Sequence, residues 1–367
     1  MKLISCAILL IFTSVVALLA QGSLNPPTAP APTMKTLLQI EPRTPIDHVP
    51  FAITNAGSYY VVSNLFGSPA TGGIGIYTNN VFIDLNGFAL RGAGNVAGVF
   101  ALVSCTNIAV MNGSVINWGD GVSLSGVHGG RIVNVHASEN RSFGIYGGAN
   151  SIIESCTATA NDAGILADNG SRIAGCVARS NSAAGFFVVG PATVVNCVAE
   201  GNGTDGIDAS RNTMVLDSSA AGNGRHGISV FDQSVIKNCV ARANGTNGLD
   251  LRVDCVVRES SSYNNGGHGI WTESGSLIVG NHCTRNGISS VGAGVRASSD
   301  CRVEANHLHG NDYGVFLPPS AQGTVIIRNT FRLNSTNLSA GAANVIGPAV
   351  TSANVATNSN PHANYYP

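Results

Sequence analysis

The chain has 367 residues, of which 44% are apolar and only 11% are charged, and its net charge is −1. This length allows one large domain or two ordinary ones. The near-neutral charge and the lack of a basic stretch argue against nucleic-acid binding and against electrostatic docking on membranes.

The first segment, residues 1–22, is predicted to be a secretory signal peptide. Met1-Lys2 supplies a positive start, an apolar run follows to Ala20, and small residues around Gln21 offer a cleavage site. A retained membrane anchor is the alternative, because about 18 apolar residues just span a bilayer. Cleavage would deliver a protein without a membrane segment to the periplasm, the cell surface or the medium.

Residues 23–50 contain seven prolines, which indicate an extended segment rather than a packed helix. From Phe51 onward, short β-rich stretches alternate with glycine and asparagine turns. No stretch keeps a helical period.

Residues 51–339 repeat with a period of about 21 residues. An asparagine recurs at a turn in steps of 20 to 25 residues: Asn117, Asn140, Asn161, Asn181, Asn202, Asn223, Asn244, Asn265, Asn286, Asn311 and Asn334. In most repeats a glycine follows shortly and precedes an aliphatic residue or Phe: Ile145, Ile165, Phe186, Ile207, Ile228, Leu249, Ile270, Val295 and Val315.

Each repeat holds about three short strand-like pieces and few leucines, which disfavours a leucine-rich repeat. We therefore expect an all-β fold, a single right-handed parallel β-helix of about twelve three-strand coils. The turn asparagines are expected to adopt left-handed backbone and to stack their amides along the axis. The bare ends of such a stack need covers, and residues 23–50 and 340–367 are the candidates.

Coils such as V-I-K-N-C-V-A-R-A-N-G-T-N-G-L-D (235–250) resemble the right-handed parallel β-helix repeats of the pectin-lyase-like superfamily. The flanks at 29–46, 57–61 and 360–365 resemble uncharacterised secreted bacterial members of that group. The resemblance covers nearly the whole mature chain and implies the fold. It implies no single activity, because that superfamily includes lyases, hydrolases, epimerases, esterases, phage tailspikes and adhesins.

The catalytic motifs of that superfamily are incomplete in this chain. N-G-T-D-G-I-D (202–208) and G-G-H-G-I (266–270) resemble parts of the polygalacturonase pattern. The coil that should carry paired aspartates has Arg225-His226 instead, so the carboxylate pair for acid–base chemistry is missing. Motifs of pectate lyases, alginate epimerases and serine esterases are absent from the sequence.

Four successive coils nevertheless concentrate polar residues at positions expected to face outward. These positions are the residue before the recurring glycine, the residue after the buried aliphatic, and the one two further on. In most coils these positions hold small or apolar side chains, but between residues 205 and 273 they hold histidine, carboxylate, arginine and tryptophan side chains that could bind or process a ligand. We predict catalytic roles for His226, His268, Asp205 and Asp208, and substrate-binding roles for Asp250, Arg252, Trp271, Glu273 and Arg225.

Each of these residue types fits a polysaccharide site. A histidine can act as general base, Trp271 can stack on a sugar ring, and the aspartates can accept hydroxyl groups or bind Ca²⁺. No other cofactor is predicted. An ordinary solvated face is the alternative, because outward positions must be polar somewhere.

Two further groups have weaker patterns. His307, His309 and Asp312 form a small cluster near a turn, and His282 beside Cys283 lacks further metal ligands. Zinc is not predicted, since there is no C-x-x-C pair.

Eight of the nine cysteines follow the signal peptide. Four of them share one register with Ser218 and Ser260: Cys156, Cys176, Cys197 and Cys239. A register that accepts serine suits a small packed residue, so we predict buried, unpaired thiols.

Two functions remain open on the sequence. The first is an exported β-helix protein that binds or processes an extracellular polysaccharide or cell-surface glycan, as a lyase, epimerase or glycoside hydrolase if it is an enzyme. The second is a non-catalytic surface, adhesive or spacer protein, favoured by the low charge and the incomplete motifs. The oligomeric state is not predictable from the sequence.

Overall fold

The computed structural model describes residues 41–94, 96–101 and 104–367. The predicted signal peptide and most of the proline-rich segment lie outside these residues. Residues 44–367 form one unit, and every regular element described in it is a strand. Among the described residues there is no helix of the length and apolar character needed to cross a membrane.

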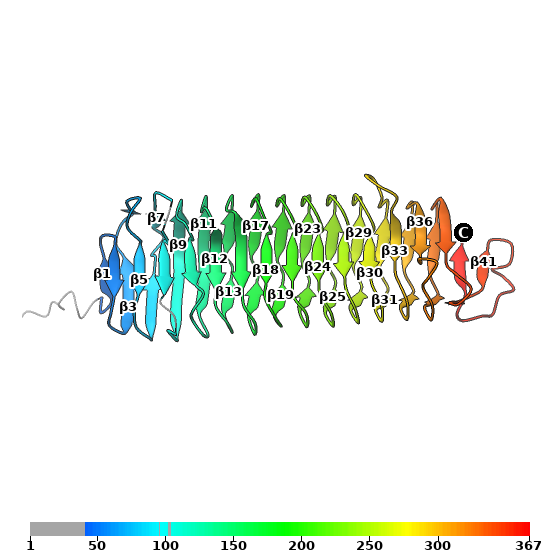
Figure 1. Cartoon of the computed structure of the whole chain (residues 1–367), viewed down its shortest axis with the longest axis horizontal. Coiled ribbons are helices and arrows are strands. Elements are labelled where there is room, and N and C mark those ends of the chain that lie inside the picture. The colour runs from blue at the N-terminus through cyan, green and yellow to red at the C-terminus, as the bar shows by residue number, and fades with distance from the viewer. Residues whose placement is uncertain (1–40, 95, 102–103) are drawn as a thin grey trace, which may run out of the picture. The chain divides into compact units, whose positions relative to one another are not determined.

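One strand of each coil belongs to a parallel 14-stranded sheet (Figure 1). Its strands are β2 (Phe51–Ile53), β5 (Ile74–Ile76), β8 (Val99–Ala101), β10 (Val122–Leu124), β12 (Phe143–Gly147), β15 (Ala163–Ala167), β18 (Phe186–Val188), β21 (Ile207–Ala209), β24 (Ile228–Val230), β27 (Leu249–Leu251), β30 (Ile270–Thr272), β33 (Ala293–Arg296), β36 (Tyr313–Phe316) and β39 (Thr336–Ser339).

The other strands form a 28-stranded sheet with two rows. The first row is β1 (Thr44–Ile46), β3 (Gly57–Val61), β6 (Val81–Asp84), β9 (Ile108–Ile116), β11 (Arg131–Ser138), β13 (Ile152–Glu154), β16 (Arg172–Ala174), β19 (Thr193–Val195), β22 (Met214–Leu216), β25 (Val235–Lys237), β28 (Val256–Arg258), β31 (Leu277–Val279), β34 (Arg302–Glu304), β37 (Val325–Ile327) and β40 (Val345–Ile346).

The second row is β4 (Leu65–Phe66), β7 (Ala89–Arg91), β14 (Thr157–Thr159), β17 (Val177–Arg179), β20 (Val198–Glu200), β23 (Ser219–Ala221), β26 (Val240–Arg242), β29 (Ser261–Tyr263), β32 (His282–Thr284), β35 (His307–His309), β38 (Thr330–Arg332), β41 (Ala349–Thr351) and β42 (Asn364–Tyr366). The long strands β9 and β11 run through the corner and join the two rows.

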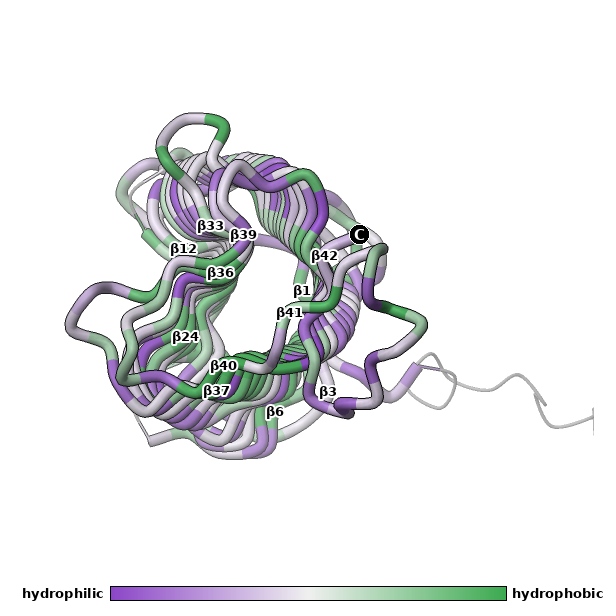
Figure 2. Tube along the Cα trace, turned by 90° about the vertical axis from the view of Figure 1, so that its right-hand side faces the viewer, coloured by the Kyte–Doolittle hydropathy of each residue, from purple (hydrophilic) through white to green (hydrophobic). Residues whose placement is uncertain are grey.

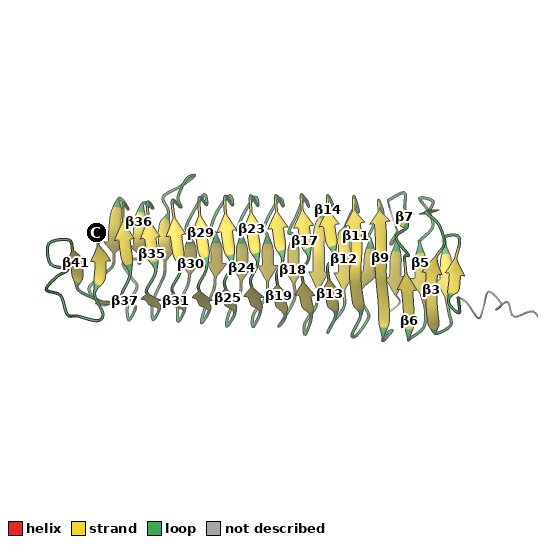
Figure 3. Cartoon of the chain, turned by 180° about the vertical axis from the view of Figure 1, so that it is seen from behind, coloured by secondary structure: helices red, strands yellow, loops and turns green. Residues whose placement is uncertain are grey.

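This arrangement is the expected right-handed parallel β-helix. The coils stack around three faces, as the view down the stack shows (Figure 2), and the reverse view shows the strands of successive coils side by side (Figure 3). The 14 strands of the smaller sheet correspond to slightly more coils than the expected twelve, because coils also form on either side of the most regular repeats.

The core consists of the predicted aliphatic ladders. The side chains that follow the recurring glycine, from Ile145 to Val315, are all fully buried. Glycine is needed before them because a Cβ at Gly227 would lie 2.6 Å from Nδ2 of Asn244 and 2.6 Å from a backbone oxygen of the next coil. Removal of these side chains from water is the main stabilising contribution to a fold whose single coils bury little alone.

Asparagine amides form a hydrogen-bonded ladder along the β-helix, as predicted, from Asn140 to Asn334. In the middle of this ladder, Nδ2 of Asn223 donates to Oδ1 of Asn244 at 2.9 Å and to the carbonyl oxygen of Ala199 at 3.3 Å. The expectation of left-handed backbone is confirmed at Asn117, with φ 58°, and was wrong at the asparagines from Asn140 to Asn334. The residue before each of the latter takes that conformation instead, as Ala243 does with φ 53°.

The predicted thiols are confirmed, because all eight described cysteines are buried and free. Cys156 and Cys176 sit at a corner where the backbone N–H of one coil donates to the side chain of the next, at 3.4 Å. Ser218 fills the same role toward Cys197 at 3.1 Å. The register therefore selects a small hydrogen-bond acceptor rather than a disulfide.

Candidate functional site

The middle position of the 14-stranded sheet forms an outward line of side chains in register. In β21, Asp208 lies between Ile207 and Ala209, which both belong to the core, so its side chain faces away from the core. We call the aligned residues of six successive coils the outer ladder: Phe187, Asp208, Ser229, Asp250, Trp271 and Arg296. The predicted alignment of Asp208, Asp250 and Trp271 is thus confirmed.

Asp205 precedes this line and is only 1% exposed. Its carboxylate accepts hydrogen bonds from Nε of Arg225 at 2.9 Å, from Nη2 of the same guanidinium, and from the backbone N–H of His226 at 2.9 Å. The expectation that Asp205 faces solvent was wrong, because Arg225 from the next coil covers it. Both side chains therefore tie neighbouring coils together, although Arg225 keeps an exposed side.

Asp208 differs from Asp205 in having no hydrogen bond to any described residue. Burial raises its pKa to about 6, the nearby charges of Asp205 and Asp250 add to this rise, and Arg225 opposes it. A carboxyl group with such a pKa exchanges protons readily near neutral pH. Asp208 is therefore the carboxyl group of this surface that is chemically available to a ligand.

His226 and Asp250 form a pair between adjacent coils on the outer face. Nδ1 of His226 lies 3.4 Å from Oδ2 of Asp250 and 3.0 Å from the hydroxyl of Thr246. Asn247 donates to the same carboxylate oxygen at 2.6 Å. Burial lowers the pKa of His226 and raises that of Asp250, while their attraction opposes both shifts. These contacts hold Asp250 in place, and only 5% of it is exposed.

His268 is fixed as a neutral imidazole. Its Nδ1 accepts a hydrogen bond from the backbone N–H of Ala293 at 3.0 Å, so that nitrogen carries no proton. Burial and, to a lesser degree, Arg296 lower its pKa to about 4. A base this weak is poorly suited to the predicted role of general base at neutral pH, but its Nε2–H remains a hydrogen-bond donor.

Trp271 lies among guanidinium groups. Arg252 from the preceding coil and Arg296 from the following coil lie 5.3 and 5.6 Å from the centre of its ring. Arg252 also reaches the ring of Phe231 and pairs with Glu273 at 2.9 Å. The predicted binding residues Arg252, Trp271 and Glu273 therefore form one connected group.

Arg296 was missed in the sequence analysis. It follows the buried Val295, so the rule that selected Asp208 and Trp271 also selects it. The chain inserts extra residues before this coil, which interrupts the regular 21-residue spacing of the four coils that carry the other predicted residues. No salt bridge joins Arg296 to a described residue, which leaves its guanidinium available to an anionic ligand.

Charge is unevenly spread along the outer ladder. Asp208 and Asp250 lie before Trp271 along the ladder, and Arg296 lies after it. In the described residues, no three His, Cys, Asp or Glu side chains are placed to hold a metal ion. The Ca²⁺ role considered for the aspartates from the sequence stays a prediction.

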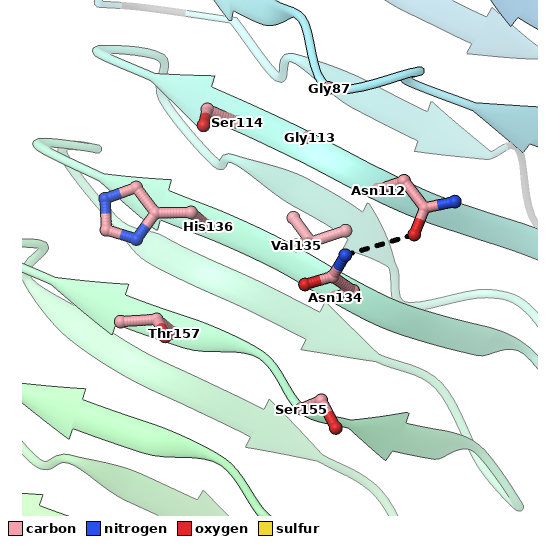
Figure 4. A pocket seen from close by; sticks show the side chains of 9 residues that line it. All are labelled: Gly87, Asn112, Gly113, Ser114, Asn134, Val135, His136, Ser155 and Thr157. Carbon is pink, nitrogen blue, oxygen red and sulfur yellow. Dashed lines mark hydrogen bonds between the residues drawn. The ribbon is translucent and has the colours of Figure 1, made fainter.

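A concave surface lies on the other sheet, where β9 and β11 run through the corner (Figure 4). This hollow of about 340 Å³ is lined by asparagine, serine and threonine side chains and by His136. Nδ2 of Asn134 donates to Oδ1 of Asn112 at 3.1 Å across its wall. The lining of the hollow contains no carboxylate and none of the predicted site residues. It is concave, but His136 is its only side chain suited to acid–base chemistry.

The family model for a right-handed β-helix region matches residues 72–216 and 207–361. No curated protein sequence matches the chain.

The solved structures similar in fold include two A-modules of mannuronan C-5 epimerases from Azotobacter vinelandii. The AlgE4 module is 14% identical over 80% of this chain and 91% of its own, with a TM-score of 0.59. The AlgE6 module is 17% identical over 85% of this chain and 90% of its own, with a TM-score of 0.54. At these identities the likeness shows the fold alone.

Proposed function

Because this chain belongs to the right-handed β-helix family, we propose that it binds an extracellular polysaccharide along the outer ladder of the 14-stranded sheet. One observation carries the proposal. Within one line of in-register residues, Asp208 has no hydrogen-bond partner and Arg296 has no carboxylate partner among the described residues, although most other charged groups nearby are paired.

The ladder offers contacts for a sugar chain laid along the stack. Asp208 and Arg296 are four coil steps apart, a span of about 19 Å at ~4.8 Å per step. Trp271 lies between them, one coil step before Arg296, and provides an aromatic ring. Asp208 can accept hydrogen bonds from sugar hydroxyl groups, and Arg296 can attract a sugar carboxylate. An anionic sugar polymer such as mannuronan suits this set, and the fold likeness to mannuronan epimerase modules makes it the first ligand to try.

Export is part of the proposal. The apolar N-terminal segment of residues 1–22 would direct the chain across a membrane. A ligand outside the cell is consistent with that route.

Processing of the bound chain is a second candidate function, favoured by Asp208 alone. With a pKa of about 6, this carboxyl group can take up or release a proton next to a bound sugar at neutral pH. Incubation of mannuronan with the protein, followed by NMR of the polymer, tests this role. A change in the polymer that Asp208→Asn abolishes supports processing, and an unchanged polymer argues for binding alone.

Calorimetric titration with mannuronan oligosaccharides tests the binding proposal. Trp271→Ala is expected to weaken binding by about 1–3 kcal/mol, on the scale of a buried interface aromatic. Arg296→Ala is expected to weaken binding and to reduce its dependence on salt.

Tyr146→Ala is the matched control, because Tyr146 occupies the same outward position six coil steps before Trp271. It should bind as the wild type does. No binding of mannuronan or of a neutral polysaccharide, or an equal loss in Tyr146→Ala, would favour the adhesive or spacer function instead.

A further inference from the structure

Three histidines meet on a different face of the stack, the second row of the 28-stranded sheet. His282 in β32 pairs in register with His307 in β35, and Thr284 pairs with His309. Cys283 and Leu308 between them belong to the core, so the three imidazoles face outward. Asp312, grouped with two of them on sequence alone, instead accepts a hydrogen bond from the backbone N–H of Gly292.

The imidazoles are already close to one another. The ring centres of His282 and His307 are 4.9 Å apart, and those of His307 and His309 are 6.3 Å apart. Two imidazoles that share a tetrahedral zinc ion at ~2.1 Å per Zn–N bond have ring centres roughly 5 Å apart. The backbone thus places three outward nitrogen ligands at nearly the required spacing.

Only side-chain rotation separates this arrangement from a metal site. In the described residues no three ligands yet point at a common position, and Nε2 of His282 is hydrogen-bonded to the hydroxyl of Thr284 at 2.7 Å. His282 and His307 are exposed, so their rings can turn without disturbing the core. Rotation toward a shared ion replaces one neutral hydrogen bond with three metal–nitrogen bonds.

We propose that His282, His307 and His309 bind a divalent transition-metal ion, with Zn²⁺ as the first candidate. Imidazole ligands favour zinc, copper and nickel over calcium and magnesium. Three protein ligands would leave a fourth position open to water or to a small ligand. The proposal is independent of the polysaccharide site, which lies on the other sheet.

One feature of the surroundings opposes the metal. Arg332 pairs in register with His309, and its positive charge lies on the same face. Because Arg332 is exposed, its long side chain can turn away, at some loss of affinity. Removal of this charge should therefore tighten metal binding.

Zinc titration of the metal-free full chain under reducing conditions, followed by calorimetry, tests the proposal. One ion per chain is expected, and His307→Ala should weaken its affinity by at least about tenfold, since even loss of an outer-sphere partner has effects of that size. His282→Ala and His309→Ala should also weaken binding, and Arg332→Gln should strengthen it. Co²⁺ in place of Zn²⁺ should give the intense visible absorption of a tetrahedral site.

His136→Ala is the matched control. His136 occupies the same outward line as His282 and His307, but its register partners are Ser114 and Thr157. Its variant should bind one zinc ion with unchanged affinity. Absence of zinc binding to the wild type, or zinc binding that His307→Ala leaves unchanged, would overturn the proposal.

Discussion

The asparagine ladder from Asn140 to Asn334 and the outer ladder from Phe187 to Arg296 are built by the same coil repeat but have opposite character. The inner ladder repeats one side chain, and each amide in it donates to the next coil at about 3 Å. The outer ladder changes side chain at every coil, and among the described residues Asp208 has no hydrogen bond and Arg296 has no salt bridge, although Arg296 contacts the Trp271 ring. Repetition therefore marks positions that hold the coils together, and departure from repetition marks positions available to a ligand.

The largest expected effect comes from breaking the inner ladder. Asn223→Ala removes the donor to Asn244 and Ala199, and it removes the acceptor for the amide and backbone N–H of Asn202. Buried groups left without partners cost about 1–3 kcal/mol each. We expect a loss of at least about 3 kcal/mol in the free energy of unfolding, measured in urea.

Asn169→Ala is the control for this change, because Asn169 is exposed and its side chain has no hydrogen bond to a described residue. Its expected effect is below about 0.5 kcal/mol. Similar losses in both variants would contradict a structural role for the inner ladder.

Asp205 and Asp208 should differ in their effect on stability, because the Asp205 carboxylate holds neighbouring coils together and the Asp208 carboxyl group does not. Asp205→Ala leaves Arg225 and the backbone N–H of His226 without an acceptor, and it should cost about 1–3 kcal/mol. Asp208→Ala removes no hydrogen bond and, at neutral pH, removes a charge that burial disfavours, so it should not lower stability. Chemical unfolding of both variants measures the difference, and equal effects would refute this distinction.

A smaller effect is expected at the cysteine corner. Cys176→Ser should cost less than about 1.5 kcal/mol, because serine already occupies this register at Ser218 and Ser260 and its oxygen can accept the same backbone N–H. Thermal unfolding of the reduced protein is the measurement. A severe loss would show that the register requires sulfur.

A pH dependence of stability is also expected from Asp208. Its pKa rises from 3.8 to about 6 in the folded chain, so the folded state binds the proton more tightly than the unfolded state. The stabilisation from the bound proton is complete below the lower value and is lost as the pH rises through about 6. Between these values, wild-type stability should fall relative to that of Asp208→Asn. Parallel stability profiles would contradict the raised pKa.

The fold was predictable from the sequence because its signal repeats. A glycine followed by Ile, Leu or Val recurs through many coils, and each recurrence reports the same buried position. The predicted number of coils, about twelve, is slightly lower than the 14 strands of the smaller sheet, because the repeat spacing is less regular near the N-terminal coils.

The candidate site was only partly predictable. Alternation along a strand placed Asp208, Asp250 and Trp271 correctly, since each lies between two core residues. The burial of Asp205 was not predictable, because it depends on the reach of Arg225 across a coil step. The grouping of His282 with His307 depends likewise on an inserted loop, which changes the sequence spacing without changing the register.

A crystal structure of the protein with a mannuronan hexasaccharide tests the central claim most directly. If departure from repetition marks the ligand site, the sugar chain will lie along the outer ladder, with a carboxylate at Arg296 and hydroxyl groups at Asp208. A chain bound instead in the hollow beside Asn112, Asn134 and His136 would contradict the claim.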